Sequence, residues 1–176
     1  EKQRKYLEWK KSILQPFVSM DTLKQTCKKN GKFFKAYSFT TLSREVFTKL
    51  YYLFYKEGKK TLTLEALSRL TPFSLAVWYM DDGCLITEKD SRYGKVKLRY
   101  RSSIILGKVS LEDAEIVKQY FLSKGITSCI VKNYNRQYKQ NYPAVKFSFP
   151  GTKIFQKLIK PFIVPSMKYK LSPIPV

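Results

Sequence analysis

The organisation of this chain is decided by one stretch, residues 70–83, which reads LTPFSLAVWYMDDG. Thr71 followed by Pro72 is a strong helix start, because a hydroxyl oxygen accepts from the free amides of a first turn and proline fits the first helical position. Apolar side chains fill most of the stretch, and a glycine ends it. The sequence therefore predicts an apolar helix over residues 72–82.

Two adjacent carboxylates, Asp81 and Asp82, fall at the C-terminal end of this helix. The helix dipole is negative there and disfavours each carboxylate by about 0.3–1 kcal/mol. One explanation is a solvated helix end followed by an Asp-Gly turn at Gly83. The other is a divalent cation that compensates both acids, and oxygen ligands suit Mg²⁺.

The composition indicates a folded, strongly basic protein. Its 176 residues include 34 Lys and Arg against 13 Asp and Glu, a formal net charge of +21. Because self-repulsion at such a charge works against a compact state, we expect an anionic partner. Hydrophobic residues make up 44% of the chain, which is enough for a packed core. No apolar run is long enough to span a membrane, so we expect no membrane partner.

Histidine is absent, and this restricts the chemistry that the chain can perform. The absence excludes Ser-His-Asp and Cys-His catalysis, histidine-based zinc sites and nucleases that use a histidine base. The three cysteines are far apart and predict buried thiols rather than disulfides or a zinc site. Any reaction must therefore use carboxylates, lysines and a bound metal.

Elements on either side of the 70–83 stretch follow a similar order twice, which predicts an internal repeat whose first copy lacks its beginning. We divide the chain into the remainder of a first repeat (1–60), a link (61–70) and a complete second repeat (71–176). Since the chain begins at Glu1, we expect that some upstream sequence is missing. The expected elements are a helix over 1–15, a hairpin over 20–40, a helix from a cap at Ser43 to about Tyr55, the helix 72–82, a strand over 95–107, a helix over 111–124, strands over about 126–134 and 143–149, a helix over 151–160 and an extended Pro-rich tail.

Basic side chains alternate along the expected strand 95–107. Alternation places them about 6.6 Å apart on one face, a spacing that can follow a phosphate backbone. A solvated outer face is the other explanation, but the large basic excess favours nucleic acid. The predicted nucleic-acid-binding residues are Lys95, Lys97, Arg99 and Arg101, with Lys132, Arg136 and Lys146 on neighbouring strands and Lys24 and Lys28 in the first hairpin.

The 70–83 stretch resembles the second signature helix of the LAGLIDADG homing endonucleases, above all the two-motif, intron-encoded kind found in organelles. Two further segments match the same subfamily in the same order: YLEWK at residues 6–10, and PFIVP followed by MKYKL within residues 161–171. This resemblance implies an α+β fold with an αββαββα repeat used twice. Its signature helices pack side by side, and each repeat lays a curved antiparallel sheet along the DNA major groove.

The resemblance also implies roles for individual residues. Asp82 is expected to be the metal-binding acid, with Asp81 as a supporting position and Mg²⁺ as the metal. Lys170 is expected to lie near the hydrolytic water, and Lys60 or Lys59 to be its counterpart in the first repeat. This set fits phosphodiester hydrolysis, which needs a metal and a lysine but no histidine.

The sequence departs from the family pattern in two places. The first signature helix is missing, so only one of the two acids needed to cut both strands is present. Gly107-Lys108 also stands where family members usually carry polar Thr or Gln.

Two functions therefore stay open. The first is a site-specific, metal-dependent double-stranded DNA endonuclease, or part of one, in which a second chain supplies the missing helix. The second is a non-cleaving RNA-binding protein of the same fold, such as a group I intron maturase or an organellar ribosomal protein. The resemblance to the intron-encoded kind found in organelles implies an organellar location, in a mitochondrion or a plastid.

Overall fold

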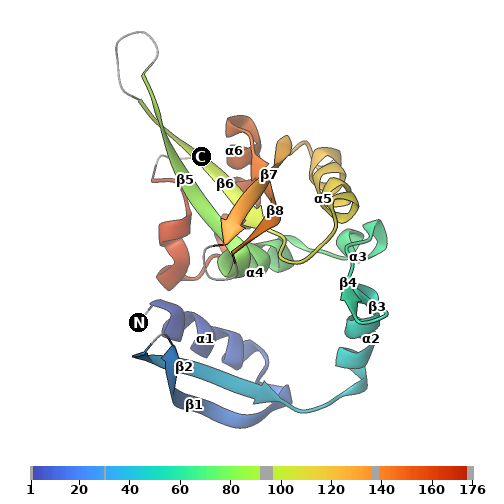
Figure 1. Cartoon of the computed structure of the whole chain (residues 1–176), viewed down its shortest axis with the longest axis vertical. Coiled ribbons are helices and arrows are strands. Elements are labelled where there is room, and N and C mark those ends of the chain that lie inside the picture. Colours follow the sequence, from blue (N-terminus) through green and yellow to red (C-terminus); the bar gives the residue numbers. More distant parts are fainter. Residues whose placement is uncertain (1, 30, 92–96, 136–138, 174–176) are drawn as a thin grey trace. The chain divides into compact units, whose positions relative to one another are not determined.

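The structure is a computed structural model (Figure 1) that describes residues 2–29, 31–91, 97–135 and 139–173, and excludes the side chains of residues 2, 20–29, 32 and 34–36. The chain forms two compact units. One consists of Glu1–Lys49 with Val164–Met167, and the other of Leu50–Ile163 with Lys168–Val176. Within the described residues, the structure contains no helix with the length and hydrophobicity that a membrane span requires.

The first unit is built on the predicted hairpin. Strands β1 (Val18–Lys29) and β2 (Lys32–Thr41) pair in antiparallel fashion, and Lys29 lies opposite Lys32 across the turn. Gly31 has a φ of +75°, the left-handed conformation that such a turn requires. Helix α1 (Lys2–Ile13) precedes the hairpin, as the sequence predicts.

The segment between the hairpin and the 70–83 stretch contains more structure than expected. Helix α2 (Glu45–Phe54) begins two residues after Ser43, and none of its residues is buried. Strands β3 (Tyr55–Lys56) and β4 (Lys59–Lys60) form a small hairpin, and helix α3 (Leu64–Ser68) lies in the expected link. Neither was predicted, because elements of two to five residues carry no periodic pattern.

The second unit contains a four-stranded antiparallel sheet in the order β5-β6-β8-β7 (Figure 1). The strand expected at 95–107 is β6, and the two later strands are β7 and β8. Strand β5 was not predicted from the pattern of residues, although the resemblance implies a strand pair after the signature helix. The strands are β5 (Gly83–Asp90), β6 (Lys97–Ile105), β7 (Ser128–Asn135) and β8 (Gln140–Phe147).

Three capped helices pack against this sheet: α4 (Pro72–Asp82), α5 (Leu111–Ser123) and α6 (Phe149–Ile159). In each, the hydroxyl oxygen of the residue before the helix accepts from a backbone N–H of the first turn; these residues are Thr71, Ser110 and Ser148. The cap at Ser148 starts α6 two residues before the expected position. The expected extended tail is wrong, because Lys160–Phe162 and Pro165–Lys170 are 3-10 helices.

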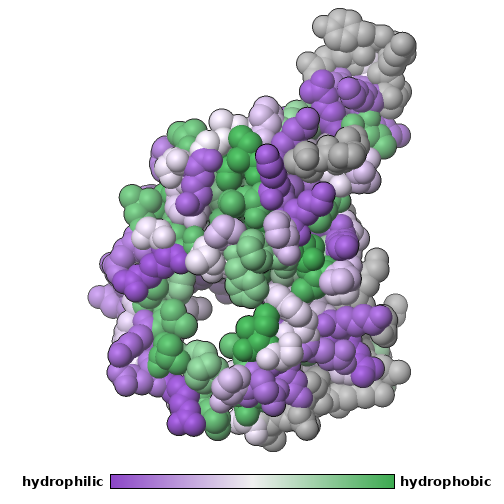
Figure 2. Space-filling view, turned by 180° about the vertical axis from the view of Figure 1, so that it is seen from behind, coloured by the Kyte–Doolittle hydropathy of each residue, from purple (hydrophilic) through white to green (hydrophobic). Residues whose placement is uncertain are grey.

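An aromatic cluster forms the core of the second unit. The rings of Phe147 and Phe155 have centroids 4.6 Å apart, those of Phe121 and Phe147 are 4.8 Å apart, and Tyr79 lies 5.3 Å from Phe155. All four side chains are buried. Adjacent strand residues point to opposite faces, so the helices cover the face that holds Phe147 and leave Lys146 on the other face. Hydrophilic side chains make up much of the surface seen in Figure 2, as the basic composition requires.

Gly83 joins α4 to β5 and allows a very close approach. Its φ of −85° is open to any residue, so conformational freedom does not explain this glycine. A Cβ atom here would overlap the Tyr79 ring and come 2.5 Å from the Tyr79 carbonyl oxygen. The absence of a side chain therefore lets β5 begin directly after α4, with the Gly83 backbone packed against Tyr79.

We expect Gly83→Ala to destabilise the fold by about 2–3 kcal/mol, because a methyl group cannot fit without moving the helix end. Gly107→Ala is the matched control, since its Cβ would meet nothing within 4 Å and its cost comes from a φ of +74° alone, about 1 kcal/mol. Urea unfolding of both variants measures the difference. Equal losses would contradict the close-approach explanation.

Candidate active site and nucleic-acid interface

The two predicted metal-binding acids lie at the exposed end of α4. The buried face of the helix consists of apolar residues and a tyrosine, whereas Asp81 and Asp82 are exposed. Asp82 is the last helical residue and is followed directly by β5. The helix therefore anchors the acids from within the core while their carboxylates stay accessible.

Lys170 lies at this same helix end, although it is ninety-one residues from Tyr79 in the chain. Its Nζ donates to the carbonyl oxygens of Tyr79 at 3.3 Å, Met80 at 2.5 Å and Asp81 at 3.4 Å. A cation is favourable at the negative end of a helix, where the last carbonyls run out of helical partners. Of the three, the Tyr79 carbonyl oxygen also accepts from the Gly83 amide. Lys170 thus caps α4 and places a positive charge beside the acids.

Burial lowers the pKa of Lys170, and the nearby carboxylates Asp81 and Asp82, together with Cys84, oppose that shift. The side chain of Lys170 is only 8% exposed. A buried ammonium is stable only when it is paired and hydrogen-bonded. The helix carbonyls and the two acids together provide this environment.

Tyr79 completes the connection and was not singled out from the sequence. Its hydroxyl donates to the Lys170 carbonyl oxygen at 2.8 Å and lies 3.1 Å from the Ser102 hydroxyl. The Gln156 side-chain amide also donates to Ser102, at 2.9 Å. Burial raises the pKa of Tyr79, which keeps the phenol neutral as a donor. The buried tyrosine thus links α4 to β6 and to the segment that carries Lys170.

Lys60, the expected counterpart of Lys170, lies in β4 and is half-buried. Its Nζ donates to the carbonyl oxygen of Leu106 at 3.4 Å, just beyond the end of β6. No group of three or more His, Cys, Asp or Glu within the described ranges could hold a metal. The end of α4 offers the two exposed carboxylates of Asp81 and Asp82. Such donors fit Mg²⁺, an ion that binds through one or two carboxylates together with waters and phosphate oxygens.

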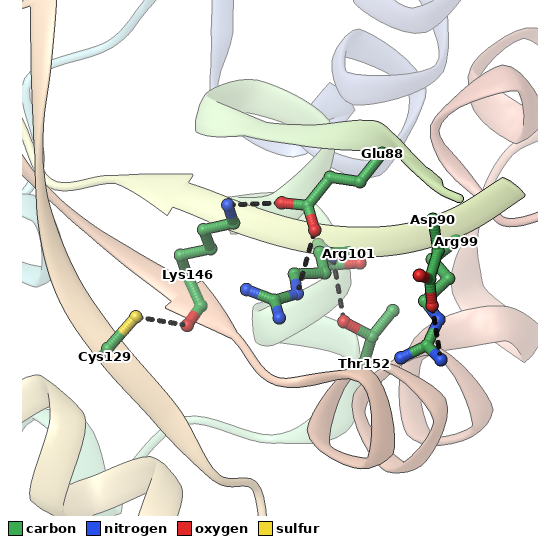
Figure 3. Close-up of polar contacts among 8 residues, drawn as sticks. Glu88, Asp90, Arg99, Arg101, Cys129, Lys146 and Thr152 are labelled. Carbon is green, nitrogen blue, oxygen red and sulfur yellow. Dashed lines mark hydrogen bonds and ion pairs between the residues drawn. The ribbon is translucent and has the colours of Figure 1, made fainter. Parts of the chain in front are cut away.

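The open face of the sheet carries both basic and acidic side chains (Figure 3). Register places Glu88 opposite Arg99, and Ser103 opposite Lys146, on this face. Lys146 lies 2.6 Å from Glu88, whose other carboxylate oxygen is 3.5 Å from Arg101 Nε. The Lys146 hydrogen bond lowers the pKa of Glu88, so the carboxyl is ionised at neutral pH.

A second ion pair and an aromatic ring hold the arginines. Arg99 lies 2.6 Å from Asp90, whose side chain is 15% exposed. The guanidinium groups of Arg99 and Arg101 lie 4.9 Å and 4.2 Å from the centre of the Phe149 ring. A cation at this distance is attracted to the face of an aromatic ring, which helps to hold each arginine side chain in place. The sequence pattern did not identify Glu88, Asp90 or Phe149 as site residues, because their role depends on strand register.

The remaining predicted binding residues are distributed differently. Lys97 is exposed at the start of β6, on the open face. Lys132 pairs with Pro143 and therefore lies on the opposite face from Lys146, so the sequence placed it wrongly beside the others. Lys95 and Arg136 lie outside the described residues. Lys24 and Lys28 belong to β1, but their side chains are outside the description.

Comparison with known proteins identifies relatives over nearly the whole chain. A family model described as the LAGLIDADG DNA endonuclease family matches residues 1–165. The chain is similar to the solved structure of the homing endonuclease I-WcaI bound to its DNA recognition sequence. The TM-score is 0.78 and the identity 25%, over 95% of this chain and 70% of that one.

Curated relatives that match the sequence include a RecA protein, an mRNA maturase and a probable intron-encoded endonuclease. Protein RecA of Mycobacterium leprae is 30% identical over 98% of this chain and 23% of its own length. Cytochrome b mRNA maturase bI2 of Debaryomyces hansenii is 33% identical over 81% of this chain and 48% of its own. Probable intron-encoded endonuclease 1 of Wickerhamomyces canadensis is 29% identical over 74% and 53%. The chain thus spans between about a quarter and about half of the length of these relatives.

We expect Lys170→Met to destabilise the end of α4, because three carbonyl oxygens lose a charged donor. Hydrogen bonds to charged groups contribute about 1.5–3 kcal/mol, so the free energy of unfolding should fall by about 2 kcal/mol. The Gly83 amide, which donates to Tyr79, should also exchange faster with deuterium. Lys168→Met, at an exposed lysine of the same 3-10 helix, should change neither quantity. Equal effects of the two variants would show that Lys170 does not cap the helix.

Proposed function

The chain belongs to the LAGLIDADG DNA endonuclease family, and from this premise we propose that it forms the second half of a site-specific homing endonuclease that binds and cuts duplex DNA. The observation that carries the proposal is the end of α4. There, two exposed acids end a largely buried helix, and Lys170 is hydrogen-bonded to the carbonyl oxygens of the same turn. The likeness to an endonuclease structure solved with DNA supports duplex DNA as the partner.

Mg²⁺ is the proposed metal, with Asp82 as its ligand and Asp81 as the adjacent supporting acid. When bound, such an ion stabilises the attacking and leaving oxygens of a phosphodiester. Lys170 offsets negative charge at the acids and holds the backbone that carries them. Lys60 remains its proposed counterpart from the first repeat.

Cutting both strands of a duplex takes one signature acid from each repeat, and residues 1–176 contain one signature helix. Cutting by residues 1–176 therefore requires a second signature helix. We propose that a polypeptide that carries a first repeat can supply this helix, or a second copy of the chain through self-association at residues 72–82. By this account residues 1–176 alone bind duplex DNA but do not cut both strands.

Structured RNA is the second candidate partner. The observation that favours it is the similarity to a cytochrome b mRNA maturase, which covers 81% of the chain. The yeast relatives, one of them named as an intron-encoded endonuclease, support our proposal of an organellar location.

We expect Asp82→Asn to abolish cutting in any assembly that cuts, because the metal loses its carboxylate. Circular duplexes that carry a randomised segment serve as substrate, with Mg²⁺ and either a first-repeat fragment or an excess of the chain. Linear products are counted by sequencing. Affinity for the same duplexes should stay equal or rise slightly, since one negative charge facing the phosphates is lost.

Asp113→Asn, a carboxylate in the first turn of α5, is the matched control and should leave cutting intact. Retained cutting by the Asp82 variant would refute the active-site assignment. If no assembly cuts and structured RNA outcompetes the duplexes, the RNA-binding function replaces the endonuclease one.

A further inference from the structure

The open face of the β5-β6-β8 sheet contains two acids. A surface that binds DNA would have a higher affinity without them, because they repel phosphates. We call this open face the charged sheet face, and its residues are Glu88, Asp90, Lys97, Arg99, Arg101 and Lys146. Neutralisation of phosphates by cations supplies most of the sequence-independent affinity for DNA. Two carboxylates among four cations reduce this electrostatic contribution to the affinity. The presence of the two acids on this face therefore needs another explanation.

Glu88 is the central residue of this face. Its two carboxylate oxygens lie 2.6 Å from Lys146 Nζ and 3.5 Å from Arg101 Nε. Both of these cations are largely covered, with side chains 20% and 28% exposed. A phosphate that approached Lys146 would have to replace Glu88 and would be repelled by it. Glu88 therefore weakens phosphate contacts, which duplex DNA of any sequence could make.

A carboxylate on such a face also has a favourable partner in DNA. In the major groove, Glu and Asp accept a hydrogen bond from the N4 amino group of cytosine, and Arg donates to guanine O6 and N7. The arginines beside Glu88 are held in place by other contacts, since Arg101 lies 4.2 Å from the Phe149 ring centre and Arg99 lies 2.6 Å from Asp90. The face thus holds a fixed acceptor next to fixed donors.

We propose that Glu88 is a specificity-determining residue of the charged sheet face. Glu88 lowers the affinity of this face for duplex DNA of any sequence, and it selects a cytosine amino group at one position of the target. This inference rests on the proposed function, because it presupposes that the face binds duplex DNA. It goes beyond that function by assigning the acids, and not the basic residues alone, to sequence discrimination.

The test compares Glu88→Gln with Glu115→Gln on the full chain. Glu115 is a matched control because it also pairs with a lysine at 2.6 Å, Lys118, but on α5. The probe is a pool of random-sequence duplexes of about 40 base pairs, with affinity measured between 50 and 200 mM salt. Glu88→Gln should bind the pool about five- to tenfold more tightly at low salt and steepen the salt slope by about 1, because Lys146 becomes free to contact a phosphate.

Glu115→Gln should change the pool affinity by less than twofold. Selection from the pool followed by sequencing should show one position where the wild type prefers cytosine and the Glu88 variant does not. The double variant Glu88→Gln with Lys146→Met should return the salt slope to that of the wild type, which also shows that the fold persists.

Equal effects of the two single variants, or weaker pool binding by Glu88→Gln, would overturn the role of Glu88 while the binding function stands. A wild-type affinity that does not depend on salt would instead refute the nucleic-acid function itself.

Discussion

The end of helix α4 and Lys170 hold each other in place through reciprocal contacts. The Lys170 ammonium donates to the last carbonyl oxygens of the helix, and the Tyr79 hydroxyl of that helix donates back to the Lys170 carbonyl oxygen. Each half of this arrangement needs the other, because a helix end leaves unpaired carbonyls and a buried ammonium needs acceptors. The same contacts place the Lys170 charge beside Asp81 and Asp82, at the negative pole of the helix.

The residues at the two ends of α4 predicted its bounds correctly, but they did not predict the contacts that the helix makes with the rest of the fold. Thr71 and Pro72 fixed the start of the helix, and the structure has the predicted bounds Pro72–Asp82. Gly83 also ends the helix as predicted, but for a different reason: a side chain there would overlap Tyr79. A glycine signal shows where a helix stops, whereas the contact that requires the glycine depends on tertiary packing.

The binding face could be predicted only in part, for a similar reason. Alternation along β6 identified Lys97, Arg99 and Arg101, because period two is a local property of a strand. The acids that pair with them lie on β5, and only register brings Glu88 within reach of Lys146. Register also places Lys132 on the other face of the sheet. Distances of this kind depend on how the strands pair. The spacing of residues within one strand carries no information about that pairing.

Our proposals together require that the charged sheet face, and not the helical side of the second unit, contacts duplex DNA. Reductive methylation of lysines, read by mass spectrometry with and without random-sequence duplex at low salt, tests it most directly. Our account predicts that duplex protects Lys97, which is exposed on the charged sheet face, while Lys153 and Lys157 of α6, both exposed, react as before. Protection of the α6 lysines with unchanged reaction at Lys97 would contradict it.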